Sequence, residues 1–230
     1  MVKHVRFKKA AILGVLLLFS FTIANAGENS TKPQFTTGLD IGYSSGFHIQ
    51  MSGMVSDFAR EFPLSFRASV GYSTVEPGDA AAARRIFINN ATNGIPEEKG
   101  SQWELRFDLL YPVQIFSIKT SYLYLGPRYV RFKGNFKYIG GNEDFDVKSN
   151  QWGVGTGLES HFPMSQSVDL VLSGGLDYFP SATLTGHDTS YSPDEEAVNP
   201  REDYTFDDAD EAINQPKLEP RLIVGIAYRF

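Results

Sequence analysis

Aromatic–proline pairs recur in this chain at intervals of about 50 residues. They are Phe62-Pro63, Tyr111-Pro112 and Phe162-Pro163, which stand 49 and 51 residues apart. Gln102-Trp103 and Gln151-Trp152 precede the second and third pairs, so 8 to 10 residues separate each tryptophan from the next aromatic residue before proline. A tilted strand of that length rises roughly 20 to 25 Å, the height of the apolar band of a barrel that spans a bilayer. The repeat therefore predicts hairpins that each cross a bilayer twice.

The first 26 residues have the pattern of an export signal. Four basic residues among the first nine precede an apolar run of 15 residues from Ala10 to Ala24, and Ala24-Asn25-Ala26 fits the small-x-small cleavage pattern. The run is shorter than the ~20 residues that a spanning helix needs, so we expect a signal peptide over 1–26 rather than a membrane anchor. The mature chain would be one barrel domain over 27–230.

Charge and cysteine content exclude several classes of function. Removal of the signal takes away four bases and no acid, which changes the formal net charge from −6 to −10. Such a chain lacks the basic stripe that displaces counterions from nucleic acid, so we expect no nucleic-acid partner. The sequence contains no cysteine, which excludes zinc–thiolate sites, redox motifs and cysteine nucleophiles.

Eight segments alternate apolar residues with small or polar ones, which is the pattern of half-buried strands. They lie at about 35–43, 47–55, 64–72, 103–111, 118–132, 152–162, 168–178 and 218–230. In the segment 118–132 the inward face is ambiguous, because Leu123 and Leu125 on one face and Tyr122 and Tyr124 on the other are all apolar. The pattern predicts an all-β fold of eight antiparallel strands.

The connections between these segments alternate in length. Those near 57–63, 112–117 and 163–167 are short, whereas 74–101, 133–150 and 180–215 are long, with Ser44-Ser45-Gly46 a short exception among the latter group. Short periplasmic turns and long outer loops are typical of small membrane barrels. Within 133–150 we expect the two strands to continue beyond the bilayer to a turn at Tyr138-Ile139-Gly140-Gly141-Asn142, with lysines facing acids across the hairpin. The prediction is an eight-stranded, up-and-down transmembrane barrel with both termini in the periplasm.

This architecture resembles the small outer-membrane β-barrel family, to which the transmembrane domain of outer-membrane protein A belongs. The terminal Tyr228-Arg229-Phe230 resembles the signal read by the barrel-assembly machinery of Gram-negative envelopes. The resemblance implies a location in the cell outer membrane, contact with outer-membrane lipids and lipopolysaccharide, the assembly machinery as a partner during biogenesis, and a monomer. The sequence ends at Phe230, so we expect it to lack the peptidoglycan-binding domain of outer-membrane protein A.

The polar face of the strands is expected to point into the barrel. The apolar face has Trp and Tyr at its ends and aliphatic residues at its centre, as a lipid-facing band does. The other face is rich in Gly and Ser and holds charges of both signs, namely Asp40, Arg67, Glu104, Arg106, Asp108, Glu159, Asp169, Glu219 and Arg221. Enclosed charges must pair, so we expect a plugged lumen. A soluble lipocalin-like barrel is the alternative, with the two faces exchanged.

The long loops are the candidates for binding a partner. Asp79 is placed to cap a short helix over 80–88, and Asn89-Asn90 and Asn93-Gly94 supply turn residues. Loop 180–215 holds ten acids and one base, Arg201, and its run Asp207-Asp208-Ala209-Asp210-Glu211 could offer oxygen ligands to a divalent cation such as calcium. Its spacing is not that of an EF-hand loop, and a solvated acidic loop is the simpler interpretation. An extracellular ligand of these loops is left open.

No catalytic, cofactor-binding or metal-binding residue is predicted. His48 and His161 fall on the inward face, where buried histidines usually satisfy hydrogen bonds. His187-Asp188 with Ser190 contains the residue types of a nucleophilic triad, but neighbours in sequence show no geometry. The His-x-Ser signature of outer-membrane lipid A deacylases has no match. We therefore expect a structural or surface-interaction role, with a narrow pore or transporter for small solutes or apolar molecules, and a lipid-modifying enzyme, as alternatives.

Overall fold

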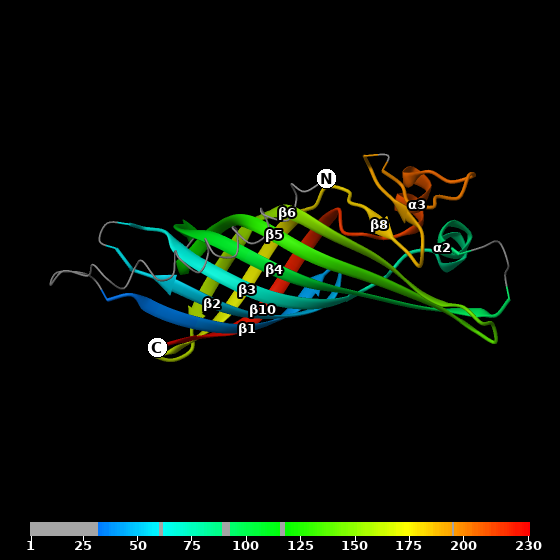
Figure 1. Ribbon diagram of the computed structural model, residues 1–230. Coiled ribbons are helices and arrows are strands. Elements are labelled where there is room, and N and C mark those ends of the chain that lie inside the picture. The colour runs from blue at the N-terminus through cyan, green and yellow to red at the C-terminus, as the bar shows by residue number, and fades with distance from the viewer. Residues whose placement is uncertain (1–31, 60–61, 89–92, 116–117, 195) are drawn as a thin grey trace.

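The chain folds into one closed antiparallel sheet (Figure 1). The computed structural model describes residues 32–59, 62–88, 93–115, 118–194 and 196–230. Within them eight long strands pair in the order β5-β4-β3-β2-β1-β10-β7-β6, and the pairing of β5 with β6 closes the ring. These strands are β1 (Gln34–Ser44), β2 (Gly46–Ser56), β3 (Ser65–Val75), β4 (Ile95–Ile115), β5 (Ile118–Ile139), β6 (Asp144–Pro163), β7 (Val168–Tyr178) and β10 (Leu218–Arg229). The predicted eight-stranded barrel is confirmed.

Three of the strands are about twice as long as the other five. β4, β5 and β6 have 21, 22 and 20 residues, against 11 or 12 in each of the others. Their additional residues continue past the end of the closed ring as a three-stranded ribbon, with Ile95 opposite Ile139 and Lys137 opposite Asp144. The predicted extension of the two strands in 133–150 is confirmed, and the turn between them includes Gly140 at a φ of 82°, where glycine is favoured. The region 133–150 is thus mostly strand.

Two of the expected connection boundaries were wrong because β4 is longer than its alternating segment. The connection predicted at 74–101 covers only 76–94, since residues 95–101 belong to β4 and pair with β5. The turn predicted at 112–117 is likewise shorter, because 112–115 continue β4. Pro112 is tolerated there because the pairing of β4 with β3 ends at Leu110, so one edge of β4 is free.

The connection between β3 and β4 and the connection between β7 and β10 contain short helices and strands at the ribbon end of the barrel (Figure 1). The helix α2 (Ala80–Phe87) lies between β3 and β4. The connection between β7 and β10 contains β8 (Leu184–Thr185), β9 (Ser190–Tyr191) and the helix α3 (Phe206–Ala212). We call the helix α2, the whole connection 179–217 between β7 and β10, and residues 132–147 of the β5–β6 hairpin the cap. The C-terminus lies at the opposite end of the molecule.

One of the two helices was predicted from the sequence and the other was not. The helix expected over 80–88 is confirmed at Ala80–Phe87, with the Asp79 carboxylate accepting from the Ala82 amide at 2.7 Å. The helix α3 was not predicted. The expected signal peptide 1–26, the turn residues Asn89-Asn90 and the acid Glu195 lie outside the described residues. No helix in the described part of the chain is both long and apolar enough to cross a membrane.

Candidate functional site

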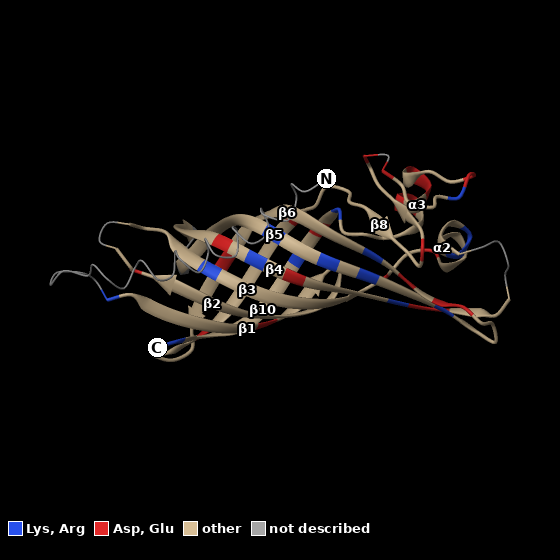
Figure 2. Cartoon of the chain, in the orientation of Figure 1, with Lys and Arg blue, Asp and Glu red and all other residues tan. Residues whose placement is uncertain are grey.

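Charged side chains fill the middle of the barrel. Figure 2 shows acidic and basic residues side by side along the central strands. The nine charges predicted to point inward all have little exposure, and the structure adds Asp177 of β7 and Arg128 of β5 to them. Arg128 was missed because the inward face of its strand was ambiguous in sequence.

Asp177 lies at the centre of this network. Its carboxylate accepts from Arg106 Nη1 at 2.6 Å and from Arg128 Nε at 3.0 Å. Arg128 also reaches Asp108 at 2.7 Å, and all three of these side chains are almost fully buried. The lumen has room for them because glycine faces them: a Cβ atom at Gly155 would collide with Asp177 and Arg128. Three strands, β4, β5 and β7, are thereby linked across the interior.

Further ion pairs extend the network toward both ends. Arg67 bridges Asp108 and Glu159, and His161 contacts Glu159 at 2.8 Å and Asp169 at 3.4 Å. On the cap side, Glu104 pairs with Arg106 at 2.6 Å and with Arg221 at 3.5 Å. Arg221 donates to Gln50, which in turn donates to Asp40. Buried charges paired in this way occupy the lumen with side chains rather than with a water column.

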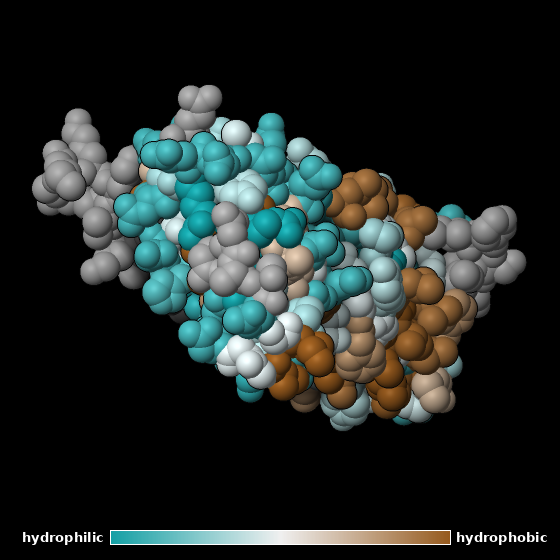
Figure 3. Space-filling view, turned by 90° about the vertical axis from the view of Figure 1, so that its right-hand side faces the viewer, coloured by the Kyte–Doolittle hydropathy of each residue, from teal (hydrophilic) through white to brown (hydrophobic). Residues whose placement is uncertain are grey.

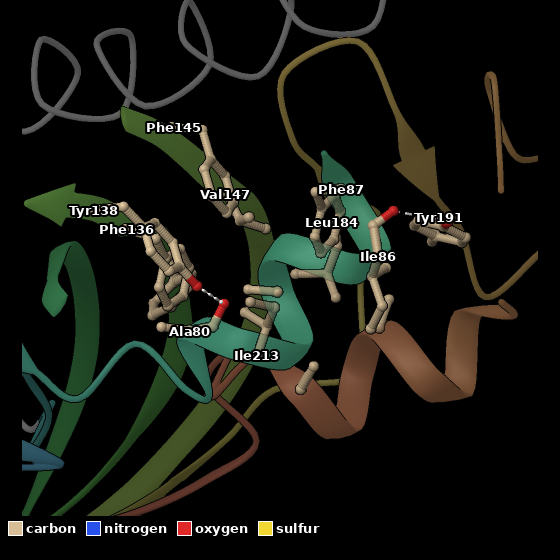
Figure 4. Close-up of a cluster of buried hydrophobic side chains, with 14 residues drawn as sticks. Ala80, Ile86, Phe87, Phe136, Tyr138, Phe145, Val147, Leu184, Tyr191 and Ile213 are labelled. Carbon is tan, nitrogen blue, oxygen red and sulfur yellow. Dashed lines mark hydrogen bonds between the residues drawn. The ribbon is translucent and has the colours of Figure 1, made fainter. Parts of the chain in front are cut away.

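The cap has a hydrophobic core of its own, separate from the barrel wall (Figure 4). Its buried members come from both helices, from β8 and β9 and from the inner face of the β5–β6 hairpin. They are Ala80, Ala83, Ile86, Phe87, Phe132, Phe136, Tyr138, Phe145, Val147, Leu184, Tyr191, Ala209, Ala212 and Ile213. Such a core makes the cap an ordered structure, unlike the solvated loops that the sequence suggested for most of it.

Specific polar contacts fix α2 to the rest of the cap. The Tyr138 hydroxyl donates to the Ala80 carbonyl at 2.6 Å, and the Tyr191 hydroxyl donates to the Ile86 carbonyl at 3.2 Å (Figure 4). The buried Arg84 guanidinium pairs with Glu143 and lies 4.4 Å above the Tyr138 ring. The helix is therefore held at its start, middle and end, over the ribbon end of the barrel.

The histidines considered for catalysis do not form a catalytic site in the described residues. His187 and Asp188 are 71% and 70% exposed, and their nearest charged atoms are 3.6 Å apart. Ser190 is buried in β9 and pairs through its backbone with Val198. His48 and His161 are buried in the lumen as predicted, with His48 Nδ1 2.7 Å from the Ser73 hydroxyl.

The acidic run Asp207–Glu211 forms most of α3 instead of a metal-binding loop. The Asp208 carboxylate accepts from both the backbone and the hydroxyl of Thr205 at 2.7 Å, completing a capping box. These hydrogen bonds hold the pKa of the Asp208 carboxyl below its ordinary value. Asp210 binds Gln215 at 2.6 Å and Lys217 at 2.8 Å. No group of three potential metal ligands converges in the residues that the structure describes.

The outer wall of the barrel is apolar in a continuous band. Outward side chains such as Leu39, Met51, Leu125 and Ile226 are each more than half exposed. At the cap side the band ends in aromatic residues, with Trp103 packed on Tyr72 at 5.1 Å and Trp152 on Tyr129 at 5.0 Å. The space-filling view in Figure 3 separates into a hydrophilic area and a hydrophobic one. Charges inside and apolar residues outside fit a lipid surrounding and exclude the soluble alternative.

The chain is similar, to different degrees, to several proteins of known structure. No family model and no curated protein matches the sequence. Among solved structures, the chain is similar to the crystal structure of a major outer membrane protein from Thermus thermophilus, at a TM-score of 0.71 and 25% identity over 87% of this chain and 100% of that one. Neisserial surface protein A, at 15% identity, gives a TM-score of 0.39 over 86% of this chain and 96% of that one. Ail of Yersinia pestis, at 11% identity, gives 0.41 over the same shares.

Proposed function

We propose that this chain, an integral outer-membrane β-barrel of eight strands, is a non-conducting barrel whose function lies in the surface of its cap. The observation that carries the proposal is that charged side chains fill the lumen while an ordered cap stands at one end of the barrel. The ion pairs centred on Asp177 fill the lumen, and the cap, which has an apolar core of its own, stands at one end of the barrel. The cap would face the outside of the cell, and the mature barrel over 27–230 would form a single domain.

The fold favours a surface role over the alternatives. A pore needs a continuous path, whereas the described lumen is crossed by arginine–carboxylate bridges between strands that are not neighbours in the sheet, such as Arg67–Glu159, Arg106–Asp177 and Arg221–Glu104. A lipid-modifying enzyme needs a nucleophile beside a base, and the exposed His187 and the buried Ser190 do not supply that pair. An ordered cap projecting beyond the membrane is suited to recognition, because its side chains are held in place before a partner arrives.

The first test is ion conductance of the refolded chain, without residues 1–26, in a planar bilayer. We expect no steady single-channel steps from protein whose insertion is shown by its shifted mobility when unheated. We expect this result because arginine–carboxylate pairs packed in the lumen leave no path for hydrated ions. Discrete, reproducible steps would move the function to transport and overturn the proposal.

The second test places the cap on one side of the membrane. Because the sequence has no cysteine, single cysteines can be introduced at the exposed Thr185 of the cap and at the exposed Gln166 of the turn between β6 and β7. In intact Gram-negative cells, a membrane-impermeant maleimide is expected to label T185C and to leave Q166C unlabelled. After the outer membrane is permeabilised, both should react. Labelling of Q166C alone in intact cells would reverse the orientation and exclude a surface role for the cap.

A further inference from the structure

Basic side chains gather on the outer wall of the β5–β6 hairpin, just beyond the apolar band. Arg131 and Lys133 point outward from β5 and Lys148 points outward from β6, and all three are exposed. Figure 2 shows basic residues along this part of the hairpin. The cluster contrasts with the chain as a whole, in which acids outnumber bases by 27 to 21.

The arrangement of the cluster leaves positive charge uncompensated. Lys133 stands directly opposite Lys148 in the antiparallel pairing, a juxtaposition of like charges that destabilises a hairpin. Both ammonium groups lie 3.0 Å from one carboxylate, that of Asp146. Partial burial raises the pKa of the Asp146 carboxyl, but the hydrogen bonds from Lys133, Lys148 and Asn135 outweigh it and lower the pKa overall. Three bases against Asp146 and against Asp194, which lines the groove beside Lys148, leave a local charge of +1, which a bound anion would neutralise.

The height of the cluster matches the headgroup layer of a membrane. Trp103 and Trp152 mark the edge of the apolar band, and Arg131 lies directly opposite Trp103 on the neighbouring strand. Lys148 precedes Trp152 by four residues, which corresponds to about 10 Å of height on a tilted strand. Phosphate groups of outer-leaflet lipids occupy the polar layer of several ångströms that begins at this edge. The bases therefore stand at the level of lipid phosphates and of the sugars attached to them.

A polar groove adjoins the cluster. A cavity of about 550 Å³ lies between β6 and the chain around β8. Its lining includes the polar residues Ser181, Thr183, Thr185, Asn150 and Asp194 together with Ala182 and Pro193, and Lys148 belongs to both the groove and the cluster. Hydroxyl, amide and carboxylate groups are partners for the many hydroxyl groups of a saccharide.

We propose that the outer wall of the β5–β6 hairpin binds the phosphorylated sugar headgroup of a glycolipid in the surrounding leaflet. Arg131, Lys133 and Lys148 bind its phosphate, the groove beside β8 takes up part of its saccharide, and its acyl chains follow the apolar band below Trp152. The site lies on the outer wall of the barrel and shares Lys133 and Thr185 with the cap, and it is independent of the non-conducting lumen. It gives the expected contact with outer-membrane glycolipid a place and a set of residues.

Tryptophan fluorescence offers a direct readout, since the two tryptophans of the chain flank the cluster. The refolded protein in a neutral detergent is titrated with a bisphosphorylated lipid A-type glycolipid, with phosphatidylglycerol and with inorganic phosphate. We expect the glycolipid to bind most tightly. The double variant Lys133→Glu with Lys148→Glu should lower the affinity for the glycolipid by about tenfold or more, because each base near a membrane surface contributes measurably to binding anionic lipid. Thr185→Phe, which fills the groove, should lower the affinity for the glycolipid and leave the affinity for phosphatidylglycerol unchanged.

Arg85→Glu is the matched control, because Arg85 is an exposed base of the cap on α2. It should bind glycolipid as the unchanged protein does. If the charge-reversed double variant does not refold, Lys133→Gln with Lys148→Gln removes the same two charges without introducing acids. Equal affinity for glycolipid and phosphatidylglycerol, equal affinity for inorganic phosphate, or unchanged binding in both lysine variants would overturn the proposal. The conductance result does not depend on these residues, and the labelling result reports only the side of the membrane on which Thr185 lies, so this site can fail while the proposed role of the cap stands.

Discussion

Replacing Asp177 with alanine is expected to lower the free energy of unfolding by about 3–5 kcal/mol, the cost of breaking a buried ion pair by removing one partner. Asp177 accepts from both Arg106 and Arg128, so its loss leaves two buried guanidinium groups short of an acceptor. Arg106 keeps Glu104 and Arg128 keeps Asp108, which limits the loss to a part of the network. Urea unfolding of the protein refolded in lipid vesicles, followed by tryptophan emission, measures the change.

The control is Asp188→Ala, which removes an exposed carboxylate of the cap. It should leave the unfolding midpoint within experimental error, because exposed charges contribute little to stability. A double-mutant cycle gives a sharper criterion. The double variant Arg106→Leu with Asp177→Leu should lower the free energy of unfolding by less than the sum of the two single variants, because both partners of the ion pair are then removed together. If Asp177→Ala unfolds no more easily than Asp188→Ala, the charged lumen does not hold the barrel together.

The sequence predicts the barrel well because each lipid-facing strand repeats with a period of two. In strands such as β4, apolar and charged residues alternate strictly, so the inward positions of Glu104, Arg106 and Asp108 follow from the pattern alone. The strand β5 shows where this reasoning stops. Tyr124 and Leu123 are both apolar, and Tyr124 points inward because Gly157 and Gly175 leave space for its hydroxyl in the lumen. That space is set by other strands.

The two cap helices show the same limit. The helix α2 follows from local sequence, since Asp79 precedes a run of alanines and caps it. The helix α3 also has a local signal, Thr205 three residues before Asp208, but the surrounding acids suggested a solvated loop. It is ordered because Ala209 and Ala212 pack into the same core as α2, and the backbone amide of Asp79 donates to the Ala212 carbonyl. Packing between segments so far apart in the chain is not visible in either segment alone.

Phe87→Ala is expected to open the cap while the barrel stays folded. Phe87 is 1% exposed, and its ring packs edge-on against Tyr191 at 5.5 Å. Truncation of a buried phenylalanine costs about 3–5 kcal/mol, and here the small core that joins α2 to β8 and β9 loses that stabilisation. A local unit that loses this much opens more often, by roughly a hundredfold for 3 kcal/mol. Trypsin cleavage at Arg84, Arg85 or Arg201 should accelerate accordingly, because proteolysis follows the population of the open form.

Val198→Ala is the matched control, since it truncates a cap side chain that is 58% exposed. It should be cleaved at the rate of the unchanged protein. The barrel of the Phe87→Ala variant should keep its shifted mobility when unheated and its urea midpoint, because Phe87 is absent from the lumen network and from the lipid-facing band. Unchanged cleavage of Phe87→Ala would mean that the cap is held by its polar contacts rather than by its apolar core. Loss of the barrel together with the cap would mean that the two fold as one unit, and the cap could then not act as a separate recognition surface.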